Sequence, residues 1–174
     1  WYGVLWAGEP ARGRAPTAES VHERCEVHQD MSGFDLVAGG KLLFAVLLGA
    51  LVGVERQIHG RPAGLRTHIL VCVGSTLIVV VGQTLGPQVD PGRAMAGIVT
   101  GIGFLGAGVI IKSKDVVRGL TTAACIWFVA GIGIAIGEGL YAVAGAATGI
   151  AIVVLIAFGW AAHWLPNAKY HTAV

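Results

Sequence analysis

Five apolar segments, each near the length of a membrane-spanning helix, alternate with short polar segments along residues 31–165. They cover approximately residues 36–54, 69–85, 94–111, 120–137 and 140–162. Because a helix needs about 20 apolar residues to cross ~30 Å of hydrocarbon, each segment is predicted to span a bilayer. Proline and glycine between residues 86 and 92 predict a tight turn. The pattern therefore predicts an all-α, polytopic membrane protein with about five transmembrane helices.

Composition supports this class. The chain has 174 residues, of which 55% are hydrophobic and 13% charged, whereas soluble domains carry about a quarter charged residues. The net charge is only +2, and basic residues do not cluster with aromatic residues between them. Both observations argue against binding to nucleic acid. The length accommodates one membrane domain, residues 31–165, followed by a short polar tail at 166–174.

Residues 1–30 differ from the rest, with eight charged residues, two prolines and no sustained apolar run. Two interpretations stay open. The segment is either a disordered polar tail or lies upstream of a true start at Met31. It is not predicted to be a signal peptide, because no apolar region follows a basic start.

The third segment, 94–111, is rich in glycine and has two small faces on a helical wheel. One small face holds Ala94, Gly97, Gly101 and Gly108; the other holds Ala96, Gly103, Gly106 and Ala107. A bulky stripe of Ile98, Ile102, Leu105 and Val109 lies between them. This predicts a central third helix that packs through its glycines on both sides, with the stripe toward lipid. Because glycine weakens helices, a kinked or broken helix is the alternative.

Two features of the first segment bear on packing. Gly49 and Gly53 form a small-xxx-small pair, which predicts close approach by another helix. Lys41 lies near the outer end, where its long side chain is expected to snorkel to the headgroups.

Lysine and arginine are unevenly shared between the loops. The loops after the first and third segments and the C-terminal tail contain Arg56, Arg61, Arg66, Lys112, Lys114, Arg118 and Lys169. The opposite side has only Arg93. By the positive-inside rule, the C-terminus is predicted to be cytoplasmic.

Glu55 ends the first segment, where a carboxylate usually finds a partner. One interpretation is a structural ion pair with Arg66 or Arg118. The other is a polar site at the cytoplasmic helix ends, which would meet an ion, an anion or a partner's side chain. Its candidate residues are Glu55, Arg56, Arg66, Thr67, Arg118, Thr121 and Thr122. The two threonines alternatively cap the fourth helix.

Common catalytic and cofactor motifs are not supported. Residues 101–106 match GxGxxG, but they lie inside an apolar run and not between a strand and a helix. The chain has no GxSxG or HExxH motif. Its histidines, His68 among them, are dispersed and suit interfacial positions, while Cys72 and Cys125 lie in apolar runs. We therefore expect no enzyme activity and no cofactor, and we assign no metal site.

Four ordered blocks, at residues 49–57, 63–68, 101–108 and 117–124, resemble the MgtC/SapB family of bacterial membrane proteins. The resemblance implies an inner-membrane protein linked to growth in scarce magnesium and, in pathogens, to survival in macrophages. It also implies a regulatory contact with a membrane machine, the proton-driven ATP synthase. Longer members carry a C-terminal regulatory domain, whereas this chain stops shortly after Pro166, so sensing by such a domain is not inferred.

Two functions follow as expectations. The first is a non-enzymatic regulator that sits among membrane lipids and binds a membrane protein, or a second copy of itself, helix to helix. The alternative is a cation transporter or channel. Acidic residues near mid-membrane usually mark such a pathway, and no segment has one near its centre.

Overall fold

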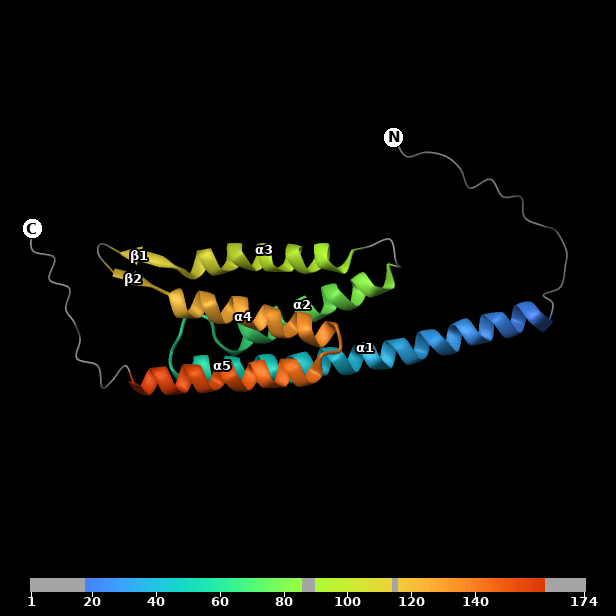
Figure 1. The fold of residues 1–174 in the computed structure, drawn as a ribbon, viewed down its shortest axis with the longest axis horizontal. Helices are drawn as coiled ribbons and strands as arrows, with labels where there is room; N and C mark the ends of the chain where they lie inside the picture. Colours follow the sequence, from blue (N-terminus) through green and yellow to red (C-terminus); the bar gives the residue numbers. More distant parts are fainter. Residues whose placement is uncertain (1–17, 86–89, 114–115, 162–174) are drawn as a thin grey trace, which may run out of the picture. The chain divides into compact units, whose positions relative to one another are not determined.

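A computed structural model describes residues 18–85, 90–113 and 116–161 (Figure 1). Its elements are α1 (Ala18–Ile58), α2 (Leu65–Thr84), α3 (Pro91–Val109), β1 (Ile111–Ser113), β2 (Val116–Arg118), α4 (Leu120–Gly137) and α5 (Tyr141–Ala161). The chain divides into two compact units between Val37 and Ala38, and every contact described below lies within the second. Helix α1 begins at Ala18, while residues 1–17 and the tail 162–174 lie outside the described residues.

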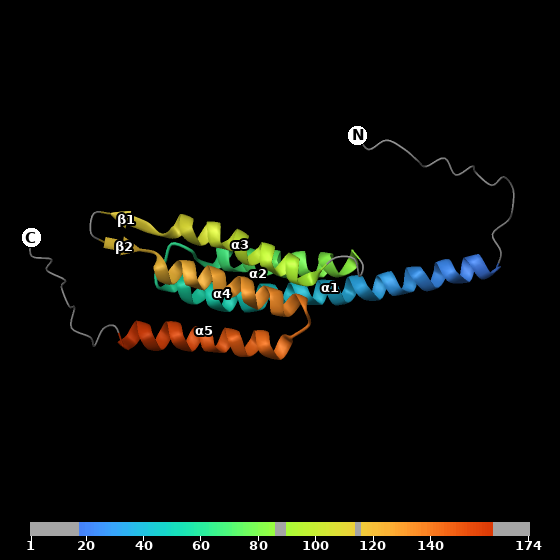
Figure 2. The ribbon, with the colours of Figure 1, turned by 45° about the horizontal axis from the view of Figure 1, so that its top comes forward.

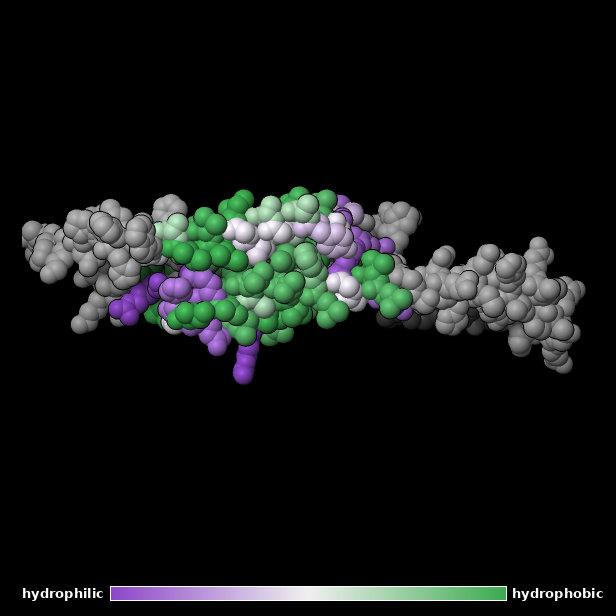
Figure 3. All heavy atoms as spheres, turned by 90° about the horizontal axis from the view of Figure 1, so that it is seen from below, coloured by the Kyte–Doolittle hydropathy of each residue, from purple (hydrophilic) through white to green (hydrophobic). Residues whose placement is uncertain are grey.

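Four helical segments are long and apolar enough to cross a membrane: Asp35–Ile58, Leu65–Thr84, Pro91–Val109 and Leu120–Gly137. A fifth apolar helix, described over Tyr141–Ala157, is slightly shorter. Hydrophobic residues cover the middle of the face seen in Figure 3, and most hydrophilic residues lie toward its two ends. The predicted all-α, polytopic membrane fold with five helices is confirmed.

The loop predicted after the third helix is a short β-hairpin. Strands β1 and β2 pair antiparallel, with Ile111 opposite Arg118 and Ser113 opposite Val116. The hairpin ends at Gly119, whose φ of 92° suits glycine. A Cβ there would also lie 2.3 Å from the Val109 carbonyl oxygen. Glycine is thus required at this position both by its dihedral angle and by the close approach of α3.

Helix α4 packs on α2, α3 and α5. Figures 1 and 2 show it running between α3 and α5. Gly133 and Gly137 bring α2 close: a Cβ on Gly133 would lie 2.3 Å from the Cys72 carbonyl oxygen, and one on Gly137 2.6 Å from Val79 Cβ. The Thr76 hydroxyl donates to the Gly133 carbonyl at 2.8 Å. This Gly-xxx-Gly contact, missed in the sequence, forms the tightest part of the bundle.

The predicted small pair on α1 does face another helix. A Cβ on Gly49 would lie 2.9 Å from the His68 carbonyl oxygen, and one on Gly53 2.7 Å from Leu65 Cα. Because neither position has room for a side chain, α1 and α2 approach through backbone contact, as the small-xxx-small spacing predicts.

Helix α3 differs from its predicted position at the centre. Only Ile98 and Gly106 are buried on it, and its bulky stripe turns toward the bundle, with Ile102 and Val109 packed against the core. Gly106 contacts Ala123, but a Cβ on Gly97, Gly101, Gly103 or Gly108 would meet nothing within 4 Å. These four glycines therefore do not pack within the described part of the chain, where the larger aliphatic side chains of α3 supply the dispersion contacts. Their packing against another helix stays a prediction. The helix is continuous from Pro91 to Val109, so it is not broken there.

The side chain of Lys41 binds protein. Its Nζ donates to the Gly137 carbonyl at 2.7 Å, an oxygen that also accepts from Gln83 Nε2 at 3.2 Å. This bond uses a carbonyl left free at the C-terminal end of α4 and joins α1, α2 and α4. The Lys41 side chain was expected to extend to the headgroups, and instead it hydrogen-bonds the C-terminal end of α4.

Candidate functional site

The polar residues singled out in the sequence lie around the turn between α1 and α2. Helix α1 ends in a Schellman motif, in which Arg61 N donates to Arg56 O at 3.1 Å and Gly60 N to Gln57 O at 3.0 Å. Gly60 takes the left-handed conformation this motif needs, with φ of 61°. The motif reverses the chain directly after Glu55 and Arg56 and so fixes where these two side chains lie.

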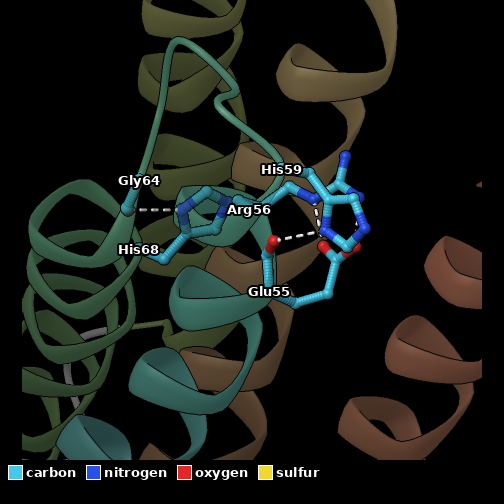
Figure 4. A network of polar contacts seen from close by, with 5 residues as sticks. All are labelled: Glu55, Arg56, His59, Gly64 and His68. Carbon is cyan, nitrogen blue, oxygen red and sulfur yellow. Dashed lines mark hydrogen bonds and ion pairs between the residues drawn. The ribbon is translucent and has the colours of Figure 1, made fainter.

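Glu55 and Arg56 form a buried, two-pronged ion pair (Figure 4). Their exposed fractions are 8% and 4%. Arg56 Nη2 donates to Glu55 Oε1 at 2.7 Å, and Arg56 Nε donates to Oε2. Consecutive helical residues normally point in different directions, yet here the guanidinium turns back onto the preceding carboxylate. Such a bidentate pair satisfies the geometry of both groups.

His59 extends this pair one helical turn onward. Its Nδ1 lies 3.1 Å from Glu55 Oε1 and 2.9 Å from the Glu55 carbonyl oxygen. Both carboxylate oxygens of Glu55 are therefore engaged by side chains of α1 and its C-terminal turn. Within the described ranges, no group of three His, Cys, Asp or Glu side chains is placed to hold a metal ion.

The two predicted ion-pair partners of Glu55 are elsewhere. Arg66 on α2 and Arg118 on β2 are both exposed, and no ion pair joins either to Glu55 among residues 18–85, 90–113 and 116–161. Glu55 pairs with its chain neighbour because Arg56 is buried beside it and shares its desolvated environment. The prediction of an ion pair was right, and its partner was wrong.

His68 is a buried polar residue that the sequence interpretation placed at the interface. It is fully buried, and its Nδ1 lies 2.8 Å from the Gly64 carbonyl oxygen. Since that oxygen accepts, the neutral ring donates from Nδ1 and leaves Nε2 as an acceptor. Nε2 is buried and has no hydrogen-bond partner among the described residues. His68 lies in the first turn of α2, where that helix crosses Gly49 and Gly53 of α1.

The remaining candidate residues do not converge on Glu55. Thr122 is buried in the first turn of α4, whereas Thr67 and Thr121 are exposed. Neither threonine of α4 caps it, because its N-cap is Gly119 and no side-chain cap bond forms. Of the predicted site, the structure brings together only Glu55 and Arg56, and it adds His59 and His68.

This end of the bundle thus combines a closed polar cluster with an open cationic surface. Figure 1 places the α1–α2 turn and the β-hairpin at the same end. The Glu55 and Arg56 charges neutralise each other inside the protein, which offsets part of the cost of burying either one. The exposed Arg61, Arg66 and Arg118 remain available to headgroups or to acidic groups of another protein.

Comparison with known proteins assigns the family. The model of the MgtC family matches residues 42–164. Protein MgtC of Salmonella typhimurium strain LT2 is 52% identical over 116 residues, which are 67% of this chain and 48% of that protein. The putative magnesium transporter YhiD of Escherichia coli strain K12 is 39% identical over 139 residues, which are 75% of this chain and 65% of that protein. Protein MgtC of Brucella abortus strain 2308 is 49% identical over 110 residues, which are 63% of this chain and 46% of that protein.

No solved structure matches the chain. The chain spans about half the length of the MgtC proteins it matches. The family model covers well over half of the present chain and includes α1 from Leu42 onward and all of α2 to α5. The resemblance seen in the four sequence blocks is confirmed, and this protein belongs to the MgtC family.

Proposed function

We propose that this protein is a non-enzymatic regulator of the bacterial inner membrane, acting by helix-to-helix contact with another membrane protein. The observation that carries the proposal is the exposure of α3. Half of the apolar stretch of α4 is buried inside the protein, whereas only 11% of the apolar stretch of α3 is buried. A glycine-rich helix with this little internal contact has surface left for a partner.

The outer face of α3 has the chemistry for such a contact. We define it as Ala96, Thr100, Gly103 and Ala107, which follow a 4-3-4 spacing and are all exposed. The Thr100 hydroxyl donates to Ala96 O at 2.8 Å, so it is satisfied within the helix. Small residues at this spacing let a second transmembrane helix approach to backbone contact, which is the main route to helix association in lipid. Phe104, 82% exposed beside this face, offers a bulky side chain to interlock with the partner.

The physiological context is part of the proposal. Relatives carry the names MgtC and putative magnesium transporter, and the family resemblance implies adaptation to scarce magnesium and survival inside host cells. We assign this chain to the same adaptation, with ATP synthase as the first partner to test. A second copy of this chain is the second partner to test.

The same proposal includes an orientation. Arg61, Arg66 and Arg118 are exposed at one end of the bundle. At the other end Arg93 is exposed, while Lys41 is bound to the Gly137 carbonyl. The positive-inside rule then places the α1–α2 turn, the hairpin and the C-terminus in the cytoplasm.

A cation transporter is the alternative, and the name of the Escherichia coli relative is consistent with it. The polar groups argue against it. Glu55 lies in the last turn of α1, and its carboxylate is occupied by Arg56 and His59. Glu138 follows the last residue of α4. Neither provides an acidic group halfway across the bilayer, where ion pathways usually carry one.

Photocrosslinking in cells tests the partner contact. A photoreactive phenylalanine analogue is placed at Ala96 or Ala107, on the outer face of α3, and at Val153 as an exposed control on α5. The proposal expects one discrete protein adduct from the two α3 positions and none from Val153, with subunits of ATP synthase identified first. Adducts to lipid alone from all three positions would contradict it.

Of two further measurements, the first tests the link to low magnesium and the second separates regulator from transporter. A deletion strain complemented with this chain should regain growth at low magnesium. Vesicles containing only the purified protein should show no magnesium influx above empty vesicles, read by an enclosed magnesium dye. Influx at a rate that depends on the protein would favour the transporter.

A further inference from the structure

Helices α2 and α3 leave a groove of about 470 Å³ between them. Its walls are Leu70, Gly74 and Ile78 on one side and Gly97, Gly101 and Leu105 on the other, over a floor that includes Ile98. Ser75 is the sole polar side chain among the described residues that line it. The groove is distinct from the outer face of α3, since it uses the flank of Gly97 and Gly101 and none of the four outer-face residues.

The dimensions of the groove suit a single hydrocarbon chain. Along α3 the lining runs from Ala94 to Leu105, which at the α-helical rise is about 16 Å. That is close to half of the ~30 Å hydrocarbon thickness, the depth of one leaflet. The length of the groove therefore matches one acyl chain of a single leaflet.

Charge at one end of the groove specifies the headgroup. The lining begins at Ala94, directly after Arg93, which is exposed and has no ion-pair partner among the described residues. Two acids lie near this end: Asp90, whose carboxylate accepts from Gly92 N at 2.9 Å, and Glu138, which lines a separate small pocket together with Pro91 and Ala94. At the opposite end the lining stops at Leu70, a full turn short of Arg66. A cation adjacent to the mouth of an apolar groove is complementary to an anionic headgroup attached to an acyl chain.

We propose that the α2–α3 groove binds one anionic phospholipid, with an acyl chain lying along Gly97 and Gly101 and the phosphate bound by Arg93. The glycines matter here because they leave open the volume that side chains would fill, as nothing lies within 4 Å of a Cβ at Gly74, Gly97 or Gly101. This site does not depend on the regulatory function proposed above.

Native mass spectrometry of the detergent-purified full chain tests the site. The protein is titrated with phosphatidylglycerol and, separately, with phosphatidylcholine of identical acyl chains, and the first bound lipid is quantified. The wild type should retain one phosphatidylglycerol in preference to phosphatidylcholine. The double variant Gly97→Leu/Gly101→Leu should lose retention of both lipids, because leucine side chains fill the groove. The matched control is Gly145→Leu, an exposed glycine of α5 that should bind as the wild type does.

The two arginines separate headgroup recognition from general surface charge. Arg93→Gln should lower the preference for phosphatidylglycerol about fivefold, the effect of one cation near an anionic lipid, while leaving phosphatidylcholine binding unchanged. Arg66→Gln should keep the wild-type preference. Thermal unfolding in the same detergent verifies that each variant is folded, and Gly74→Leu fills the groove from α2 if the double variant is not.

Three results would overturn the proposal. In the first, the folded groove-filled variants retain phosphatidylglycerol as the wild type does. In the second, the preference follows Arg66 and not Arg93. In the third, the wild type forms a dimer that groove filling abolishes while lipid retention stays the same, which would identify a second copy as the occupant.

Discussion

Helices α3 and α4 are both rich in glycine, yet they use it in opposite ways. On α4, Gly133 and Gly137 lie against α2 with no room for a side chain. On α3, four of the glycines meet nothing within 4 Å of a Cβ, and the bulky stripe makes the contacts. Glycine in an apolar helix thus marks where another surface can approach closely. It does not say whether that surface belongs to the same chain.

The largest effect is expected in the α1–α2–α4 core, at the buried ion pair. Arg56→Met leaves the buried Glu55 carboxylate without its partner and should lower the free energy of unfolding by about 3–5 kcal/mol. Unfolding by SDS in mixed micelles measures it. Arg66→Met, at an exposed arginine ten residues on, serves as control and should stay within about 0.5 kcal/mol of the wild type. Equal effects of the two substitutions would mean that the Glu55–Arg56 pair contributes no more to stability than an exposed arginine does.

Gly133→Ala tests the close contact of α4 with α2. The added Cβ would lie 2.3 Å from the Cys72 carbonyl oxygen. The α2 backbone that carries this oxygen cannot move aside as the end of a flexible side chain can. We expect a loss of about 3 kcal/mol, at the upper end for overpacking. Gly131→Ala, two residues earlier and facing open space, should instead gain up to about 1 kcal/mol from helix propensity. The comparison fails if both variants behave alike.

Gly119→Ala tests the junction between the hairpin and α4. Alanine in the left-handed conformation costs about 1–2 kcal/mol, and the approach of the Val109 carbonyl adds to it. Gly60→Ala is the matched control, because Gly60 also has positive φ but open space around it. Chemical denaturation should show a larger loss at Gly119 than at Gly60. A loss no greater than that of Gly60→Ala would exclude the steric contribution of Val109.

The smallest effect on stability is expected on α3. Gly103→Ala should leave the protein unchanged or more stable by up to about 1 kcal/mol, since it adds helix propensity and meets no atom within 4 Å. The same denaturation series used for Gly133→Ala measures it. A clear loss of stability would show that α3 packs inside the chain after all.

The contrast between these helices also shows what the sequence could predict. Hydrophobic length located α2, α3, α4 and α5 to within about four residues, because the bilayer imposes one length on every span. It could not assign a partner to each glycine, since composition is similar for a face toward α2 and a face toward lipid. The role of Gly133 and Gly137 was missed for this reason, and Gly97, Gly101, Gly103 and Gly108 make no packing contact inside the described part of the chain.

The candidate site was predictable in location and only partly in detail. A carboxylate at the end of a span requires a partner, so the ion pair at Glu55 followed from physical chemistry. The choice of Arg56 depends on how the Schellman motif turns the chain, which residue types alone do not give. His68 was underestimated because its burial arises from the approach of α1 through Gly49 and Gly53, a tertiary contact.

The central claim is that the outer face of α3 contacts another protein and contributes nothing to the fold. Gly103→Ile tests it most directly, with Gly145→Ile on α5 as control, by growth of the complemented deletion strain at low magnesium and membrane level on an immunoblot. The account predicts wild-type levels for both variants, with growth and the α3 crosslink lost only for Gly103→Ile. Full growth of the Gly103→Ile strain, with the crosslinked partner still captured, would contradict it.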